Sequence, residues 1–176
     1  MAKQKNITID YDFETTNMEI TPLSYADLDQ SWNYKNACAP YSRVYFPIEG
    51  SGVIHTAEGD IQIVPGNIYI IPSMLCFSYS CPDRLKKYYS HITITDSIGF
   101  DALSANSRVI ILPDRGEAEK ISSFSGLSGI PYSVITNGVV FSVLMRAMSE
   151  NTHFSYSVSS WLCRDSFSFS SAFSFS

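Results

Sequence analysis

Apolar and polar residues alternate in short runs through the middle of the chain, and this period of two predicts strands. The predicted strands lie in residues 42–50, 52–66, 67–72, 75–81 and 86–95, which are rich in aromatic and β-branched residues. Gly, Pro and Asp separate them, and residues 52–66 read as a hairpin with Glu58, Gly59 and Asp60 at its tip. Five or six short strands in this order favour an antiparallel sandwich or barrel over alternating strands and helices.

The pattern changes after Thr95. Residues 107–113 predict one more strand, and residues 114–124 predict a helix with Asp114 as its N-cap and acidic residues in the first turn. A second helix is expected over residues 133–150, because apolar residues recur there at intervals of three and four. Its expected packing stripe contains Val140, Leu144, Met145 and Met148.

The two ends of the chain differ from this core. Residues 1–35 predict an arm, with a short strand at residues 6–11 and a helical turn capped by Ser24. Residues 151–176 form a Ser/Phe-rich tail, to which we assign no function. Whether this tail is native or a frame-shift product stays open. The expected organisation is an arm at 1–35, a barrel at 36–112, a helical segment at 113–150 and the tail at 151–176.

Composition narrows the class of protein. The net charge of −5 argues against a nucleic-acid-binding surface, and the one basic pair, Lys86 and Lys87, is expected to be a solvated strand end. No segment resembles a signal peptide or reaches the ~20 apolar residues of a membrane helix, so we expect a cytoplasmic protein without a membrane partner. The four cysteines lack CxxC spacing and are expected to be reduced thiols.

Residues 65–81 match the spacing of a known motif. Metal-binding cupins carry G-x5-P-x-G-x2-H-x3-N, and Gly66 and Pro72 fit the first glycine and the proline. The second glycine, the histidine and the asparagine are replaced by Met74, Phe77 and Cys81. The segment therefore resembles a metal-site scaffold that has lost its imidazole.

The first cupin motif has also lost its metal ligands. When the motif is anchored on Gly50, its glutamate position falls on Arg43. Its histidine positions fall on Ala37 and Ala39, or on Asn36 and Cys38 with the longer spacer. Zinc, iron and manganese need several imidazole or carboxylate donors, so we expect no metal and no other cofactor.

Residues 32–94 resemble the N-terminal sensor domain of AraC-type transcription regulators. The landmarks are G-x-G-x-I, PG-x-I-Y-I-IP, F-S-Y and YYSH, in this order. The resemblance implies a mainly β fold: a cupin-like double-stranded β-helix, or jelly-roll barrel, followed by one or two α-helices. It also implies a small-molecule effector and a homodimer. The family binds DNA through helix-turn-helix units beyond the sensor, so we expect DNA binding only through a C-terminal domain absent from this chain.

Alternation along the strands selects candidate ligand-binding residues. The histidine position of the cupin motif points into the barrel, so Phe77 and Tyr79 are expected there. The resemblance at YYSH implies the same for Tyr89 and His91. Such aromatic planes with a few polar groups suit a sugar-like ligand. Lys35, where the family often supplies a polar contact, and Arg43 complete the set, which is Lys35, Arg43, Phe77, Tyr79, Tyr89 and His91.

Two other functions stay open. The first is a free-standing cupin enzyme, such as a metal-free sugar isomerase. The sequence shows no GxSxG elbow, no phosphate loop and no paired carboxylates, so we expect a protein that is not an enzyme and name no catalytic residue. The second is an interaction protein with a filled barrel, in which the inward aromatic residues are only core packing.

Overall fold

Strands dominate the part of the chain that the computed structural model describes, which is residues 17–95, 99, 101–104 and 106–150. The strands are β1 (Asn17–Ile20), β2 (Ser24–Leu28), β3 (Tyr34–Ala37), β4 (Ser42–Gly50), β5 (Gly52–Thr56), β6 (Gly59–Ile63), β7 (Asn67–Ile71), β8 (Phe77–Ser80), β9 (Leu85–Thr95) and β10 (Ile110–Pro113). Two helices follow, α1 (Glu117–Ser123) and α2 (Gly129–Glu150). The predictions for residues 6–11 and 151–176 lie outside the described residues.

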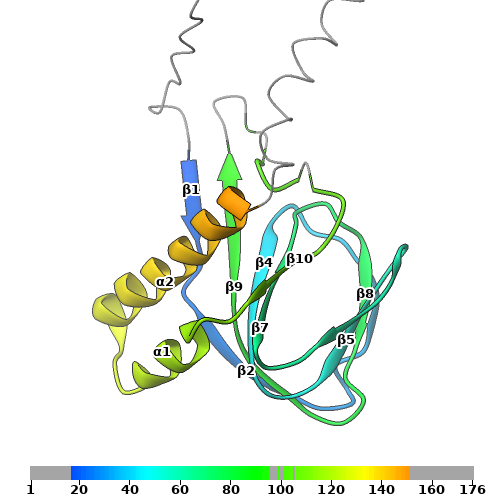
Figure 1. Ribbon diagram of the computed structural model, residues 1–176, viewed down its shortest axis with the longest axis horizontal. Coiled ribbons are helices and arrows are strands. Elements are labelled where there is room, and N and C mark those ends of the chain that lie inside the picture. The colour runs from blue at the N-terminus through cyan, green and yellow to red at the C-terminus, as the bar shows by residue number, and fades with distance from the viewer. Residues whose placement is uncertain (1–16, 96–98, 100, 105, 151–176) are drawn as a thin grey trace, which may run out of the picture.

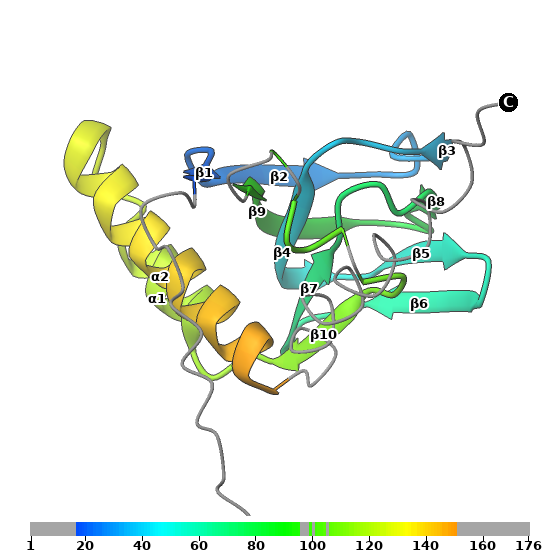
Figure 2. The same ribbon diagram turned by 90° about the horizontal axis from the view of Figure 1, so that it is seen from above.

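The strands form two antiparallel sheets that face each other (Figures 1 and 2). The larger sheet has the order β1-β9-β4-β7-β10, with β2 also paired to β9, and the smaller has the order β3-β8-β5-β6. Interior residues come from both sheets, among them Tyr45 and Tyr69 from the larger sheet and Ile54 and Phe77 from the smaller. The predicted fold class, a cupin-like β-barrel followed by helices, is confirmed.

Alternation on the larger sheet separates two hydrophobic cores. On β4, Tyr45 faces the barrel interior, whereas Val44 and Phe46 belong to the core beneath the helices. That outer core also contains Ile92 of β9 and Val140 of α2. The helices therefore cover the outer face of the larger sheet, as Figure 1 shows. A movement of β4 would therefore change the packing on both of its faces.

Helix α1 begins at Glu117, with Gly116 at the N-cap position that was predicted for Asp114. The Asp114 carboxylate accepts hydrogen bonds from the backbone N–H groups of Glu117 at 2.7 Å and Ala118 at 3.4 Å. Gly116, the residue directly before the helix, adopts a left-handed conformation with φ 98°. Arg146 of α2 donates to Glu117 at 2.8 Å, and this pair ties the two helices together.

Helix α2 buries a different stripe from the predicted one. Its buried residues are Thr136, Val139, Val140, Val143, Leu144 and Ala147. Val140 and Leu144 are therefore placed correctly, but Met145 and Met148 are exposed and the prediction that they pack is wrong. The intervals of three and four fit two faces of this apolar helix, and only the position of the sheet decides between them.

The residues before β3 also differ from the prediction. Residues 24–28 form strand β2 rather than a helical turn, and they pair with β9 from Ser24 opposite Tyr89 to Leu28 opposite Leu85. The long strand β9 offers backbone partners to β2 on this edge, so tertiary pairing overrides the local capping signal.

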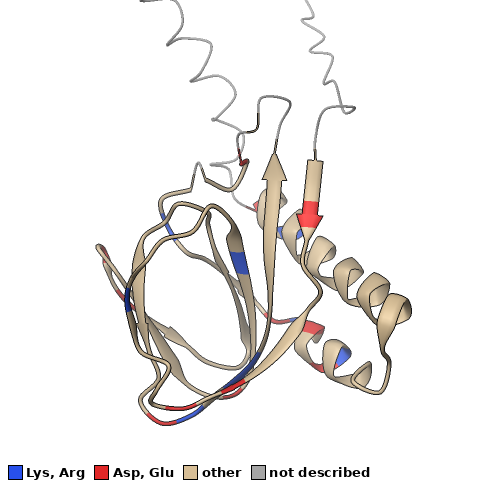
Figure 3. Cartoon of the chain, turned by 180° about the vertical axis from the view of Figure 1, so that it is seen from behind, with Lys and Arg blue, Asp and Glu red and all other residues tan. Residues whose placement is uncertain are grey.

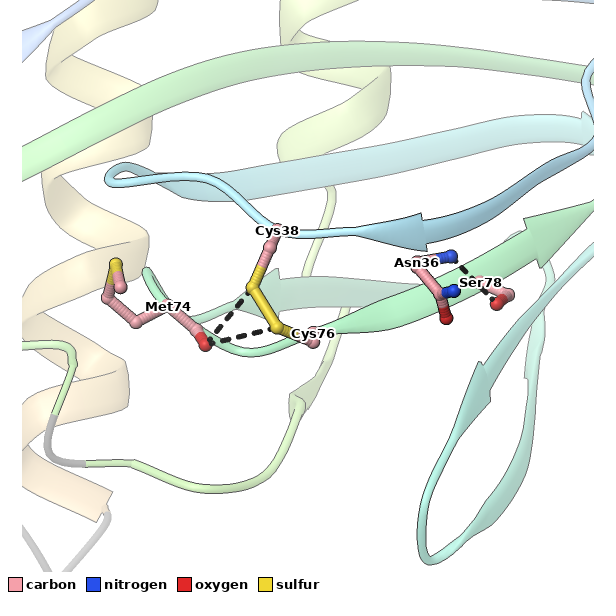
Figure 4. Close-up of a disulfide and its surroundings, with 5 residues drawn as sticks. All are labelled: Asn36, Cys38, Met74, Cys76 and Ser78. Carbon is pink, nitrogen blue, oxygen red and sulfur yellow. Dashed lines mark hydrogen bonds between the residues drawn. A yellow bond between two sulfur atoms is a disulfide. The ribbon is translucent and has the colours of Figure 1, made fainter.

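Two cysteines contradict the expectation of reduced thiols. Cys38 and Cys76 form a disulfide, and their Cα atoms lie 4.5 Å apart (Figure 4). They are 38 residues apart in sequence, and the pairing of β3 with β8 brings them together. Among the described cysteines, Cys81 stays free and is buried. A contact made by strand pairing leaves no spacing signal, and so the sequence did not predict it.

Helix α2 meets the length and apolarity of a membrane span more closely than the sequence expectation allowed. Its most apolar window has a mean hydropathy of 1.2, and 33% of that window is buried inside the molecule. The buried part packs on the outer face of the larger sheet. Length and composition alone therefore do not decide whether α2 is a membrane span or the core helix of a soluble domain.

Candidate ligand-binding site

Aromatic side chains line the barrel interior between β8 and β9. Trp32 stacks on Tyr79 with ring centroids 4.3 Å apart, and Phe77 lies 5.9 Å from Tyr79. Tyr89 and the buried Tyr45 belong to the same cluster. The structure therefore confirms that the strand alternation places Phe77, Tyr79 and Tyr89 on inward faces. Tyr79 and Tyr89 are half-buried, so part of each ring remains accessible.

Arg43 lies at the edge of this cluster. Its guanidinium carbon is 5.1 Å from the Phe77 ring centroid and 5.0 Å from the Tyr41 centroid. In the motif alignment, Arg43 and Phe77 stand where metal-binding cupins have a glutamate and a histidine, and here these two positions are in contact. No ion pair joins Arg43 to a carboxylate among the described residues. An arginine in this place favours an anion over a metal cation.

Lys87 is a second basic residue of this site. The prediction that it lies at a solvated strand end is wrong. The residue is only 3% exposed. Its Nζ atom lies 3.2 Å from the Tyr45 ring centroid, 4.3 Å from the Trp32 centroid and 6.0 Å from the Tyr89 centroid. In the described part of the chain, no carboxylate pairs with this amine.

The neighbouring Lys86 lies on the opposite face of β9. Its Nζ atom is 2.6 Å from a carboxylate oxygen of Glu49, in an exposed pair. A signal for this difference was present in the sequence: Lys87, Tyr89 and His91 share one parity along the strand, so an inward Tyr89 requires an inward Lys87. The prediction treated Lys86 and Lys87 as one solvated pair and did not apply this alternation.

Burial governs the protonation of this interior. Desolvation lowers the pKa of Lys87 well below its ordinary value, and the nearby Arg43 charge lowers it further. Desolvation, then Arg43 and Lys87, also lower the pKa of His91, and burial raises the pKa of the Tyr45 hydroxyl. All of these shifts disfavour charge in this interior, to which the described residues contribute no carboxylate partner.

His91 and Lys35 occupy different environments. His91 lies opposite Arg43 in the pairing of β4 with β9, and its ring is 4.4 Å from the Tyr41 ring and 5.7 Å from the Tyr89 ring. The structure thus brings His91 to the aromatic cluster. Lys35 is exposed on the edge strand β3, outside the interior cluster. No group of three His, Cys, Asp or Glu residues that could hold a metal exists among the described residues.

Comparisons with known proteins give matches among solved structures. No family model and no curated protein matches the chain. Solved structures do: a cupin superfamily protein from Desulfitobacterium hafniense matches at 13% identity and a TM-score of 0.36, over 47% of this chain and 81% of that one. A cupin-2 domain protein from Shewanella frigidimarina matches at 11% identity and a TM-score of 0.34, over 51% and 82%.

One solved structure extends the similarity beyond the barrel. The apo K231A form of ToxT from Vibrio cholerae matches 74% of this chain and 57% of its own, with a TM-score of 0.50 and 10% identity. The shared part is the N-terminal domain of that AraC-family protein. The chain therefore shares the fold of this ToxT domain, in agreement with the fold that the sequence landmarks implied.

Proposed function

We propose that this chain is the effector-binding part of an AraC-type transcription regulator in the cytoplasm, and that its barrel binds a small organic anion. One observation carries the nature of the ligand: the half-buried Arg43 and the buried Lys87 lie against aromatic rings with no carboxylate partner among the described residues. A buried cation without a counter-ion is costly, and an anionic ligand removes that cost.

The two cations play different parts. The planar guanidinium of Arg43 can hold a carboxylate or phosphate through two parallel hydrogen bonds. Lys87 is held toward its neutral form by burial, and an anion beside it favours the ammonium form. Ligand binding would then be accompanied by proton uptake. The rings of Trp32, Tyr79 and Tyr89 would pack against the apolar or planar body of the ligand.

Strand β4 connects the binding site to the helices, so ligand binding can affect them through this strand. Arg43 and Tyr45 face inward on this strand, while Val44 and Phe46 between and beside them pack in the core under α1 and α2. A ligand that draws Arg43 inward shifts a strand that also supports the helices. The effector would thus bias how the helices pack, which is the change a regulator needs.

A binding screen tests this assignment. The full chain carries Trp161→Phe so that Trp32 is the fluorescent reporter, and the panel contains carboxylates, sugar phosphates and neutral sugars. We expect an anion to bind, and Arg43→Met and Lys87→Met each to weaken it by about tenfold or more. Lys86→Met is the matched control, because that side chain faces outward, and its affinity should equal that of the parent. A neutral sugar that binds equally well to all variants would contradict an anionic effector.

Dimerisation through α2 is a second part of the proposal. Ile130, Val134, Phe141 and Met145 on its outward side are 45% to 79% exposed, and only Arg146 and Glu150 are charged along the whole helix (Figure 3). An apolar face of this kind suits a second copy of the chain. Light scattering should report a dimer that Val134→Glu with Met145→Glu converts to a monomer. Gln62→Glu, which adds charge on β6, should leave the dimer intact, and a monomeric parent would contradict it.

We assign no catalytic residue to this site. The rival function is a free-standing cupin enzyme, and it predicts that a compound bound in the barrel is chemically changed. Incubating the bound anion with the full chain and analysing it by mass spectrometry separates the two. Recovery of an altered product at more than one equivalent per chain would favour the enzyme.

A further inference from the structure

The Cys38–Cys76 disulfide lies on the surface beside the wall of the candidate site. Both cysteines are exposed, whereas the free thiol of Cys81 is buried and burial raises its pKa. Thiol–disulfide exchange begins with attack by an external thiolate on an accessible sulfur. Of the described cysteines, only the bonded pair is open to such attack.

This disulfide fastens a weakly held edge strand. Strand β3 pairs only with β8, and two pairs of residues stand in register, Tyr34 with Tyr79 and Ala37 with Phe77. The ladder is irregular between these pairs, where Asn36 adopts a left-handed conformation with φ 56°. A four-residue edge strand with a broken ladder has few backbone bonds of its own. The covalent link at its end therefore carries much of the attachment.

The surroundings of the two sulfurs also suit a dithiol (Figure 4). The carbonyl oxygen of Met74 lies 3.6 Å from the Cys38 sulfur and 3.9 Å from the Cys76 sulfur. A disulfide has no hydrogen to donate, but after reduction either thiol can donate to this oxygen. The backbone N–H of Met74 donates to the carbonyl of Ala39 at 2.8 Å, and this bond does not depend on the disulfide. Reduction therefore loosens the two segments without separating them.

The attached strand reaches the aromatic cluster. Ala37, next to Cys38, is in register with Phe77, whose ring contacts Arg43. At the other end of β3, the ring of Tyr34 stacks on that of Tyr79 at 5.9 Å. Trp32, which also stacks on Tyr79, lies on the segment leading into β3. Loosening β3 therefore changes the closure of the barrel next to Arg43.

We propose that Cys38 and Cys76 form a reversible thiol–disulfide site that sets how tightly β3 closes the barrel. A cellular dithiol supplies two electrons and two protons: one thiolate attacks a sulfur of the pair, the S–S bond breaks, and a mixed disulfide forms. The second thiol of the reductant then attacks the reductant's own sulfur in the mixed disulfide and releases the protein cysteine. Cys38 and Cys76 are left as thiols, and the reductant is left as a disulfide. A disulfide oxidant reverses these steps. In a reducing compartment, disulfides that do form are characteristically redox-sensing.

The test uses the whole folded chain and needs no ligand, so it is independent of the proposed function. The protein is equilibrated in glutathione buffers of graded potential or with a dithiol, the free thiols are alkylated, and the labelled peptides are identified by mass spectrometry. We expect Cys38 and Cys76 to gain label together, while Cys81 stays unlabelled. Hydrogen exchange at residues 34–37 should become about tenfold faster on reduction, and exchange in β9 should not change.

Two variants complete the test. Cys38→Ser with Cys76→Ser should reproduce the fast exchange of β3 under oxidising conditions, and Cys81→Ala should leave the redox response intact. Reduction that occurs only in denaturant would make the disulfide structural and overturn the proposal. So would a pair that never forms under oxidising buffers, or reduction that leaves exchange at residues 34–37 unchanged. If the double variant does not fold, the measurement on the parent chain still decides.

Discussion

The buried amine of Lys87 should make the stability of the protein depend on pH in a defined direction. Burial and Arg43 lower its pKa well below 10.5, so the folded state releases the proton that the unfolded chain still binds. Between the folded pKa and 10.5, the unfolded state therefore holds one more proton than the folded state. Unfolding becomes harder as the pH rises through this window, by about 1.4 kcal/mol per pH unit. Above 10.5 the effect ends, because both states are neutral.

Substitution Lys87→Met isolates this effect. The variant keeps an unbranched side chain among the Trp32, Tyr45 and Tyr89 rings but cannot titrate. The free energy of unfolding of Lys87→Met should exceed that of the parent. This difference should shrink by about 1.4 kcal/mol for each pH unit between 8.5 and 9.5. Urea unfolding followed by fluorescence at each pH measures the difference, and Lys86→Met serves as the control.

One result would refute this reasoning. If the difference between parent and Lys87→Met is constant from pH 8.5 to 9.5, the amine stays protonated in the folded protein. The aromatic rings would then hold the charge by cation–π attraction alone. Burying the Lys87 ammonium would then carry no desolvation cost, and the inference of an anionic ligand rests on that cost.

Two substitutions test the frame that positions the site. Gly50→Ala forces a Cβ atom into the carbonyl oxygen of Arg84 at a φ of +75°, so urea unfolding should show a loss of about 3 kcal/mol or more. Unchanged stability would mean that the turn after β4 can shift freely. Arg146→Met leaves the Glu117 carboxylate, only 16% exposed, without its partner and should cost about 3 kcal/mol. Arg108→Met removes a cation that is 76% exposed and should cost about 0.5 kcal/mol or less, so equal losses would contradict the role of burial.

Local patterns in the sequence were sufficient for most of the barrel. The predicted strand at residues 42–50 coincides with β4, and the predicted hairpin corresponds to β5 and β6. Period-two alternation also placed Phe77, Tyr79 and Tyr89 inside. These signals work because a strand in a barrel has one face in the interior, and that burial shapes the choice of residue at each second position.

The errors occur where a distant segment determines the outcome. Ser24 carries a local capping signal, but β9 recruits its segment as a strand. Met145 and Met148 lie on an apolar helix whose buried side is chosen by the sheet beneath it. In each case the local pattern fits two structures about equally well, and contacts from residues remote in the sequence select one.

The sequence by itself determined the class of fold and which residues stand at the ligand positions of the cupin motifs, because turn residues, strand period and side-chain identity are local properties of the chain. Only the tertiary structure decided which groups meet across the barrel. The amine of Lys87 lies against the Tyr45 ring, and Cys38 meets Cys76. Both facts depend on register between strands far apart in sequence, and register sets which side chains meet and which lose water.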